Sequence, residues 1–155
     1  MTAYTKQLFE FIQQNHLNAV QLLFQCSTHS VAEAAQAVGA TAEDFVKNIC
    51  MIAPNGGLIV AIVKGEDRAS PQKIGKLLGI PTPRLATPEE ILALSGYPCG
   101  GTPSFGYSAV FLVDERVLEK DIVYTGGGDE NALVRVSPAE LLKANGGKAA
   151  NIRKE

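Results

Sequence analysis

The segment of the sequence best suited to chemistry is residues 96–106, which reads GYPCGGTPSFG. It holds four glycines and two prolines in eleven residues. Glycine lets a backbone approach a ligand closely and proline fixes a loop at low entropic cost, so this loop can direct N–H groups at a tetrahedral oxyanion. An ordinary surface turn is the alternative. The segment lacks the Gly-Lys-Ser/Thr of a phosphate-binding loop, and it does not join a strand to a helix N-terminus as a dinucleotide-binding loop does.

A second candidate is the pair Lys47 and Asn48, at the expected junction of a short helix and a buried strand. A cation fixed at the end of a strand can bind a phosphate or stabilise a developing oxyanion. The amide of Asn48 offers both a hydrogen-bond donor and an acceptor. The competing interpretation is a solvated lysine that favours a helix C-terminus.

Three further segments carry weaker signals. His29 and Ser30 either place a helix N-terminus at an anionic substrate or are a surface residue and a helix N-cap. Asp67 and Arg68 either orient a polar ligand or belong to an ordinary polar loop. The segment 124–131, which contains the three glycines 126–128, forms either a wide hairpin loop or a second wall of the pocket that residues 96–106 would line.

The composition excludes several classes of protein. The chain has 155 residues, of which 46% are hydrophobic and 19% charged, so we expect one globular domain over residues 1–155 rather than disorder. Its net charge of −2 argues against a protein that coats long nucleic acid. No apolar run reaches the roughly 18 residues that cross a bilayer. The N-terminus does not resemble a signal peptide, so we expect a cytoplasmic protein without membrane contact.

The residues that are missing narrow the chemistry further. The two histidines and three separated cysteines have no metal-ligand spacing, so we expect neither a metal site nor another cofactor. The G-x-S-x-G motif of serine hydrolases is absent. Any hydrolysis would therefore depend on backbone donors, one lysine and the groups of the substrate itself.

Capping residues and hydrophobic periodicity predict the elements that position these segments. Helices are expected over 5–16, 30–38 and 42–46, and after the Ser/Thr-Pro pairs at 70–71, 87–88 and 137–138, with ends at Gly39, Gly79, Gly96 and Gly146. Capping boxes are expected at Glu33, Asp44, Glu90 and Glu140. Strands are expected over 20–24, 110–113, 122–124 and 132–136, with a central apolar hairpin over 48–63 that turns at 54–57. This order predicts a mixed α/β fold, a largely antiparallel sheet surrounded by helices.

Taken together, these segments resemble the YbaK family, also known as the prolyl-tRNA-synthetase-associated editing domains. The resemblance runs from about His29 to Leu142, roughly three quarters of the chain. The matching pieces, in the order of the family, are residues 29–35, 39, 47, 65–68, 73–79, 86–90, 96–98, 100–106, 114–115, 124–128 and 137–138.

The resemblance implies an aminoacyl-tRNA deacylase that acts in trans on a mischarged tRNA, with Cys- or Ala-tRNA(Pro) as the expected substrate. Its partners would be the 3′ end of the aminoacyl-tRNA and, as a candidate, prolyl-tRNA synthetase. It assigns catalysis to Lys47 and to the backbone of Gly100 and Gly101, with substrate assistance in place of a side-chain base. The residues that it implies for substrate binding are His29, Ser30, Asn48, Asp67, Arg68, Thr102, Pro103, Ser104, Phe105 and Gly106.

Two observations keep alternatives open. Many relatives have proline at the position of Ser104, whereas here the proline is Pro103, which favours a non-catalytic module that binds an aminoacyl-tRNA or a synthetase. Met1, an N-terminal helix and a short polar tail over 151–155 favour a free-standing protein over a piece of prolyl-tRNA synthetase. The middle of the chain also concentrates basic residues, which form either an acceptor-stem contact or a solvated helix face: Lys47, Lys64, Arg68, Lys73, Lys76 and Arg84.

Overall fold

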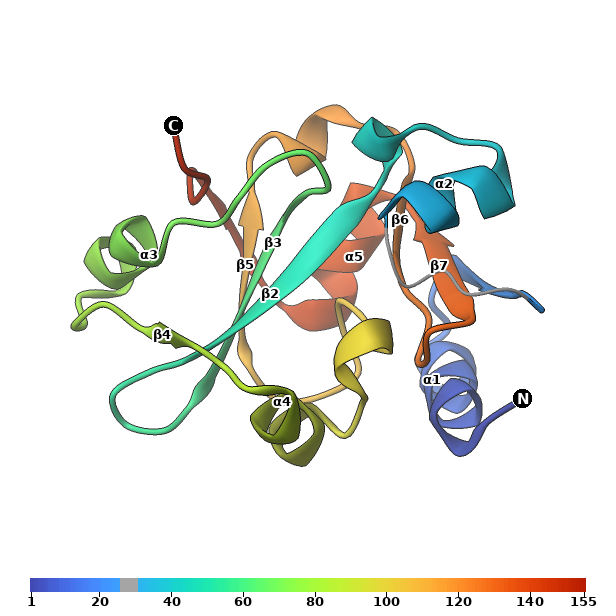
Figure 1. Cartoon of the computed structure of the whole chain (residues 1–155), viewed down its shortest axis with the longest axis horizontal. Helices are drawn as coiled ribbons and strands as arrows, with labels where there is room; N and C mark the ends of the chain where they lie inside the picture. Colours follow the sequence, from blue (N-terminus) through green and yellow to red (C-terminus); the bar gives the residue numbers. More distant parts are fainter. Residues whose placement is uncertain (26–30) are drawn as a thin grey trace.

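The computed structural model describes residues 1–25 and 31–155, and in this part of the chain two β-sheets are surrounded by helices (Figure 1). The first sheet is antiparallel and has the order β1 (Ala19–Leu23), β7 (Ala132–Val136), β6 (Val123–Gly126). The second has the order β4 (Arg84–Leu85), β2 (Val46–Ile52), β3 (Leu58–Lys64), β5 (Val110–Asp114), β8 (Lys148–Ala150). In it β3 pairs with β5, and β5 with β8, in parallel, while β2 pairs antiparallel with both β3 and β4. The expected mixed α/β fold is confirmed.

The apolar hairpin forms the centre of the larger sheet, as its composition predicts. Its strands pair from Val46 opposite Lys64 to Ile52 opposite Leu58, and Gly56 takes the positive φ of 87° that the turn requires. All seven residues of β3 are buried. Alternate side chains of β3 enter two different cores, one between the sheets and one beneath α3, because successive side chains in a strand point to opposite faces.

Five α-helices pack on these sheets within the described residues: α1 (Ala3–Gln14), α2 (Val31–Val38), α3 (Pro71–Leu78), α4 (Pro88–Ser95) and α5 (Pro138–Asn145). The predicted caps of the last three are present, because Ser70, Thr87 and Ser137 each accept a hydrogen bond from the backbone N–H three residues on. The glycines that follow these helices adopt the left-handed conformation. No helix in this part of the chain is long and apolar enough to cross a membrane.

Two local predictions need correction. The capping box expected at Glu140 is incomplete, because its carboxylate accepts a hydrogen bond from the N–H of Asn18 at 2.9 Å instead of from Ser137. The short helix expected over 42–46 is the 3₁₀ turn η1 (Ala42–Asp44), since Val46 already pairs with Lys64 in the sheet. The cap expected at Ser30 lies outside the described residues.

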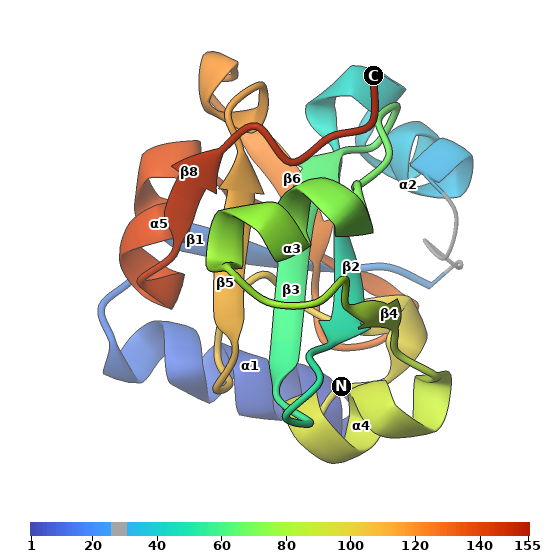
Figure 2. The same ribbon diagram turned by 90° about the vertical axis from the view of Figure 1, so that its left-hand side faces the viewer.

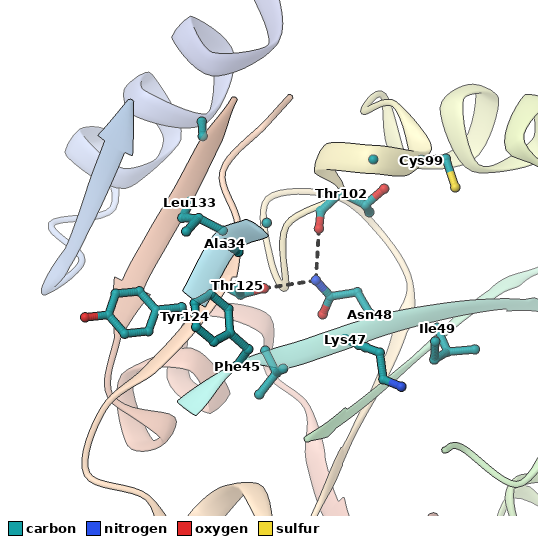
Figure 3. Close-up of a pocket in the computed structure, with 14 residues that line it drawn as sticks. Ala34, Phe45, Lys47, Asn48, Ile49, Cys99, Thr102, Tyr124, Thr125 and Leu133 are labelled. Atoms are coloured by element: carbon teal, nitrogen blue, oxygen red, sulfur yellow. Dashed lines mark hydrogen bonds between the residues drawn. The ribbon is translucent and has the colours of Figure 1, made fainter. Parts of the chain in front are cut away.

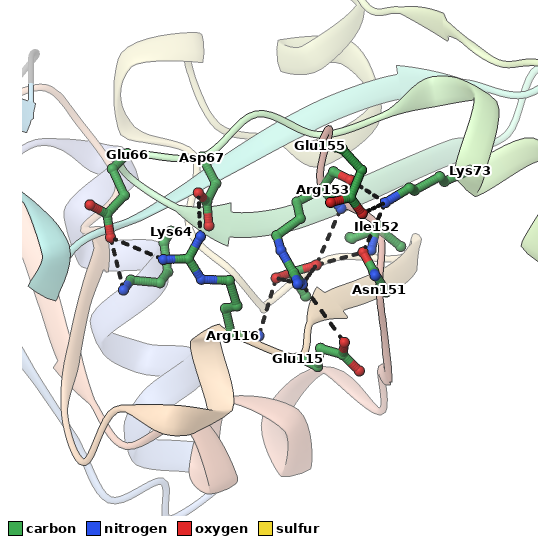
Figure 4. Close-up of polar contacts among 11 residues, drawn as sticks. Lys64, Glu66, Asp67, Lys73, Glu115, Arg116, Asn151, Ile152, Arg153 and Glu155 are labelled. Carbon is green, nitrogen blue, oxygen red and sulfur yellow. Dashed lines mark hydrogen bonds and ion pairs between the residues drawn. The ribbon is translucent and has the colours of Figure 1, made fainter.

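The C-terminal segment, expected to be a short polar tail, is packed into the domain (Figure 2). The strand β8 extends the larger sheet, and Ile152 is fully buried in the core beneath α3. The buried carboxylate of Asp114 accepts hydrogen bonds from the backbone N–H groups of Ile152 and Arg153 and from the guanidinium of Arg153 (Figure 4). A buried carboxylate needs such donors, so this contact fixes residues 151–153 against β5.

Candidate active site

A cavity of about 290 Å³ lies between the edge of β2 and the two glycine-rich loops (Figure 3). The strand β4 pairs with β2 only at Met51 and Ile52, so residues 46–49 border the cavity instead of another strand. On the opposite side lie Gly100 and Thr102, around the 3₁₀ turn η2 (Cys99–Gly101), and the β6 residues 124–126. The structure thus brings Lys47 and Asn48 together with the loop that was the strongest candidate in the sequence.

The two glycine-rich loops touch backbone to backbone. A Cβ atom on Gly126 would lie 2.1 Å from the carbonyl oxygen of Thr102, and one on Gly101 would lie 2.3 Å from the Cα of Asp129. The N–H of Gly128 donates to the carbonyl of Gly101 at 2.8 Å. Only glycine permits this approach. Both interpretations of residues 126–128 hold in the structure, since they begin the loop between the antiparallel strands β6 and β7 and Gly126 also lines the cavity.

Lys47 supplies the positive charge of the cavity. Its side chain is half-buried, and no ion pair joins it to any described residue. Burial lowers the pKa of Lys47, the positive charge of Arg68 lowers it further, and the negative charge of Asp67 partly opposes both. A cation without a protein partner at the wall of a cavity is available to an anionic ligand or a developing oxyanion.

Asn48 points to the other wall, where its amide is fully engaged. Its Nδ2 donates to the carbonyl oxygen of Thr102 and to Oγ1 of Thr125, each at 2.9 Å. Its Oδ1 accepts from the hydroxyl of Ser104 at 2.6 Å. Both amide hydrogens are used, so Asn48 has none left for a ligand.

The other residues of the glycine-rich loop 96–106 lie behind the cavity wall. Phe105 is fully buried and stacks on Phe11 with ring centroids 5.9 Å apart. The carbonyl of Pro103 accepts from the hydroxyl of Tyr107, and Gly106 has a φ of 100°. Gly101 is buried, and its N–H donates to the carbonyl of Pro98. His29 and Ser30 lie outside the described residues.

Asp67 and Arg68 do not line the cavity, although their charges reach Lys47. Asp67 is held by Arg116, whose Nη1 donates to Oδ1 at 2.9 Å (Figure 4). The other oxygen, Oδ2, is buried and has no partner among the described residues. Arg116 could not be recognised as the partner of Asp67 from the sequence, because the two residues lie 49 positions apart.

Ion pairs neutralise half of the basic residues singled out in the middle of the chain. Lys64 pairs with Glu66 at 2.8 Å, and Lys73 with Glu155 at 2.7 Å (Figure 4). Arg84 pairs with Glu90 at 2.7 Å. In the described part of the chain, Lys47, Arg68 and Lys76 have no such partner. Of these three residues, Lys47 lines the cavity.

The apolar end of the cavity was not foreseen from the sequence. Phe45 and Tyr124 stack there with ring centroids 5.1 Å apart, and Leu133 packs beside them. Phe45 follows η1 and carried no functional signal in the sequence, whereas Tyr124, in β6, opens the segment 124–131 that was a candidate second wall of the pocket. At the rim stands Cys99, which is exposed. No group of His, Cys, Asp and Glu in residues 1–25 and 31–155 is arranged to hold a metal ion.

The chain is similar to known proteins over much of its length. Residues 26–144 match the aminoacyl-tRNA editing domain family. The uncharacterized protein YwhH of Bacillus subtilis (strain 168) is 24% identical over 133 residues, which are 84% of this chain and 83% of YwhH. The proline–tRNA ligase of Nitratidesulfovibrio vulgaris (strain DP4) is 32% identical over 103 residues, 66% of this chain but only 18% of the ligase.

Two solved structures share the fold over nearly the whole chain. One, a protein proposed to be a trans-editing enzyme for prolyl tRNA synthetase, has a TM-score of 0.89 and 31% identity and covers 100% of this chain and 99% of its own. The other, the hypothetical protein APE2540, has a TM-score of 0.88 and 35% identity and covers 96% and 99%. With the family match spanning residues 26–144, the chain belongs to the aminoacyl-tRNA editing domain family.

Proposed function

We propose that this protein is a trans-acting deacylase that hydrolyses the ester of a mischarged tRNA, with Cys- or Ala-tRNA(Pro) as substrate. The observation that carries the proposal is the position of Lys47. Its ammonium has no ion-pair partner among the described residues, and Lys47 lines a cavity that Gly100 and Thr102 line on the opposite side. The family match and the ligase relative support the same activity.

The proposed reaction is the attack of a water oxygen on the carbonyl carbon of the aminoacyl ester. The carbonyl oxygen becomes an oxyanion, the bond from carbon to the ribose oxygen then breaks, and that oxygen takes up a proton. The products are the free amino acid and a tRNA with its hydroxyl restored. The Lys47 ammonium stabilises the oxyanion, and this is usually the largest single contribution to such catalysis. The proton that the water loses reaches the leaving ribose oxygen through a group of the substrate, such as the neighbouring ribose hydroxyl, which accepts this proton and donates its own.

The size of the cavity suits a small amino acid. At about 290 Å³ it lies at the lower end of ligand sites, and Phe45, Tyr124 and Leu133 close its apolar end. A synthetase gains only about 1–3 kcal/mol of discrimination from one methylene, so it cannot reject a smaller amino acid well by binding alone. A second, narrower site that admits the wrong residue and excludes the right one supplies the missing selectivity.

The charge distribution supports contact with the tRNA end alone. The chain has a net charge of −2, and three of its central basic residues are already paired with carboxylates. A protein that gripped a long stretch of backbone would need many free cations. Lys47 and Arg68 are sufficient for a contact with a terminal phosphate or ribose.

A deacylation panel tests the proposal. Purified protein is mixed with tRNA(Pro) carrying cysteine, alanine or proline, and with alanine and serine on their own tRNAs. Rapid release from Cys- or Ala-tRNA(Pro), with Pro-tRNA(Pro) spared, is the expected result. If no species is hydrolysed but an aminoacyl-adenosine analogue still binds, the protein is a non-catalytic binding module instead.

A further inference from the structure

Three side chains at the cavity wall form a closed ring of hydrogen bonds. Nδ2 of Asn48 lies 2.9 Å from Oγ1 of Thr125 (Figure 3). That oxygen lies 2.6 Å from Oγ of Ser104, and Oγ of Ser104 lies 2.6 Å from Oδ1 of Asn48. The second N–H of Asn48 points out of the ring to the carbonyl of Thr102. The ring joins β2, β6 and the glycine-rich loop 96–106.

Only one assignment of donors and acceptors fits this ring. The Asn48 amide must present its nitrogen to Thr102, because two carbonyl oxygens facing each other would repel. The amide oxygen then faces Ser104, whose single hydroxyl hydrogen it accepts. Thr125 therefore donates to Ser104 and accepts from Asn48. Each hydroxyl donates once and accepts once, and no donor in the ring remains free.

The two hydroxyls of the ring are shielded from water, while Asn48 is partly exposed at the cavity. Ser104 is fully buried, while Thr125 and Thr102 are 2% and 6% exposed. In such surroundings hydrogen bonds are electrostatically stronger, and a group that loses its partner is costly to the fold. Asn48, Thr102 and Thr125 also line the cavity, so any change in the ring is transmitted to the cavity wall.

We propose that Ser104 and Thr125 are positioning residues of the cavity, which hold the Asn48 amide so that it ties the Thr102 carbonyl to β2. This inference rests on the proposed deacylase function. With its carbonyl tied down, Thr102 presents no negative oxygen to the oxyanion, and the neighbouring Gly100 backbone stays at a fixed distance from Lys47. Ser104 thus does what a proline at its position cannot, since proline has no hydroxyl.

The test uses variants that open the ring at two different points. Thr125→Val keeps the shape of the side chain but removes its hydroxyl, and Ser104→Ala removes the other hydroxyl. Thr125→Ser restores the ring. Ser70→Ala is the matched control, because Ser70 is also buried but caps α3 on the far side of the larger sheet. Each variant is measured for its unfolding midpoint, for kcat and KM on the mischarged tRNA, and for Kd with an aminoacyl-adenosine whose ester is replaced by an amide.

The ring-opening variants should lose at least about tenfold in kcat and in analogue affinity at a temperature where they remain folded. Thr125→Ser should recover most of both, and Ser70→Ala should lower only the unfolding midpoint. If Thr125→Val and Ser104→Ala behave like Ser70→Ala, the ring is merely structural and the inference is wrong. If the wild-type protein binds the analogue without hydrolysing the ester, the proposed function fails, while the analogue Kd values still decide the role of the ring.

Discussion

Lys47 and Asn48 are consecutive residues of β2, yet their side chains leave opposite faces of the larger sheet (Figure 3). Asn48 shares its face with Cys50, in the core between the two sheets, whereas Lys47 shares its face with Met51, in the core beneath α3. Both still border the cavity, because β2 forms its edge there. In the proposed enzyme the two residues therefore have different roles: Asn48 holds the loop 96–106 in place, and Lys47 supplies the positive charge.

The pH dependence of the reaction should report the state of Lys47. Burial and Arg68 lower its pKa, so the ammonium deprotonates at a lower pH than an exposed lysine does. The catalysed rate at saturating substrate, corrected for spontaneous hydrolysis, should fall as the pH rises through this lowered pKa. Arg68→Met removes a nearby positive charge and should move the fall to higher pH. Lys47→Arg, which stays protonated, should abolish it; an unchanged alkaline fall in that variant would assign the titration to another group.

The contact between the two glycine-rich loops should not tolerate a side chain at Gly126. In Gly126→Ala the new Cβ would meet the Thr102 carbonyl at 2.1 Å, and backbone must move to relieve the contact. We expect a loss of roughly 3 kcal/mol in the free energy of unfolding, together with loss of activity. Gly57→Ala is the control, since its Cβ would meet only the flexible side chain of Asn55 at 3.1 Å. Urea unfolding of both variants is the measurement, and equal stabilities would show that the loops separate easily.

Alkylation of the Cys99 thiol should obstruct the entrance of the cavity. Cys99 is exposed at the rim, whereas burial, with a smaller contribution from the nearby Cys99, raises the pKa of Cys50 to about 12, so Cys50 stays protonated and unreactive. In a Cys26→Ser background, N-ethylmaleimide should lower kcat/KM by obstructing the cavity. The same treatment of a variant that also carries Cys99→Ser should leave the rate unchanged. Equal inhibition of both proteins would place the sensitive group elsewhere.

Lowering the pH should destabilise the N-terminus of α4, because Glu90 becomes protonated. The Arg84 guanidinium and then the backbone N–H of Thr87 lower the pKa of Glu90 to about 2. Its stabilising contribution is complete above the unfolded pKa of about 4.3 and disappears as the pH falls through about 2. In urea unfolding over this range, the midpoint of the wild-type protein should fall more than that of Glu90→Gln. The neighbouring Glu89→Gln should follow the wild type; a fall shared equally by Glu90→Gln would exclude this contact as the cause.

The sequence predicted the structural features that depend on residues close together in the chain. The Ser/Thr-Pro caps, the left-handed glycines and the apolar hairpin are all local signals, and each is present in the structure. What it missed depends on residues far apart in the chain. The carboxylate of Glu140 binds Asn18, which lies 122 positions away, and Asp114 draws residues 152–153 into the fold.

The same distinction between local signals and long-range contacts holds for the candidate site. Residue types alone marked Lys47, Asn48 and the segment 96–106, because charge, amide and glycine content are visible in the sequence. Thr125 fell within the candidate segment 124–131, but a threonine in a strand looks like any other strand residue, so the sequence could not show what its hydroxyl binds. Its significance comes from the contacts with Asn48 and Ser104, which only the packing of β6 against β2 creates.

The central claim is that the Lys47 ammonium drives the hydrolysis, and replacing it tests that claim most directly. Lys47→Met keeps most of the aliphatic stem but removes the charge. Lys76→Met is the matched control, an exposed lysine on α3 without an ion pair among the described residues. On the substrate identified by the panel, Lys47→Met should lose about 100-fold or more in kcat/KM with an unchanged unfolding midpoint, while Lys76→Met keeps its activity. Full activity in Lys47→Met would contradict the assignment of the active site.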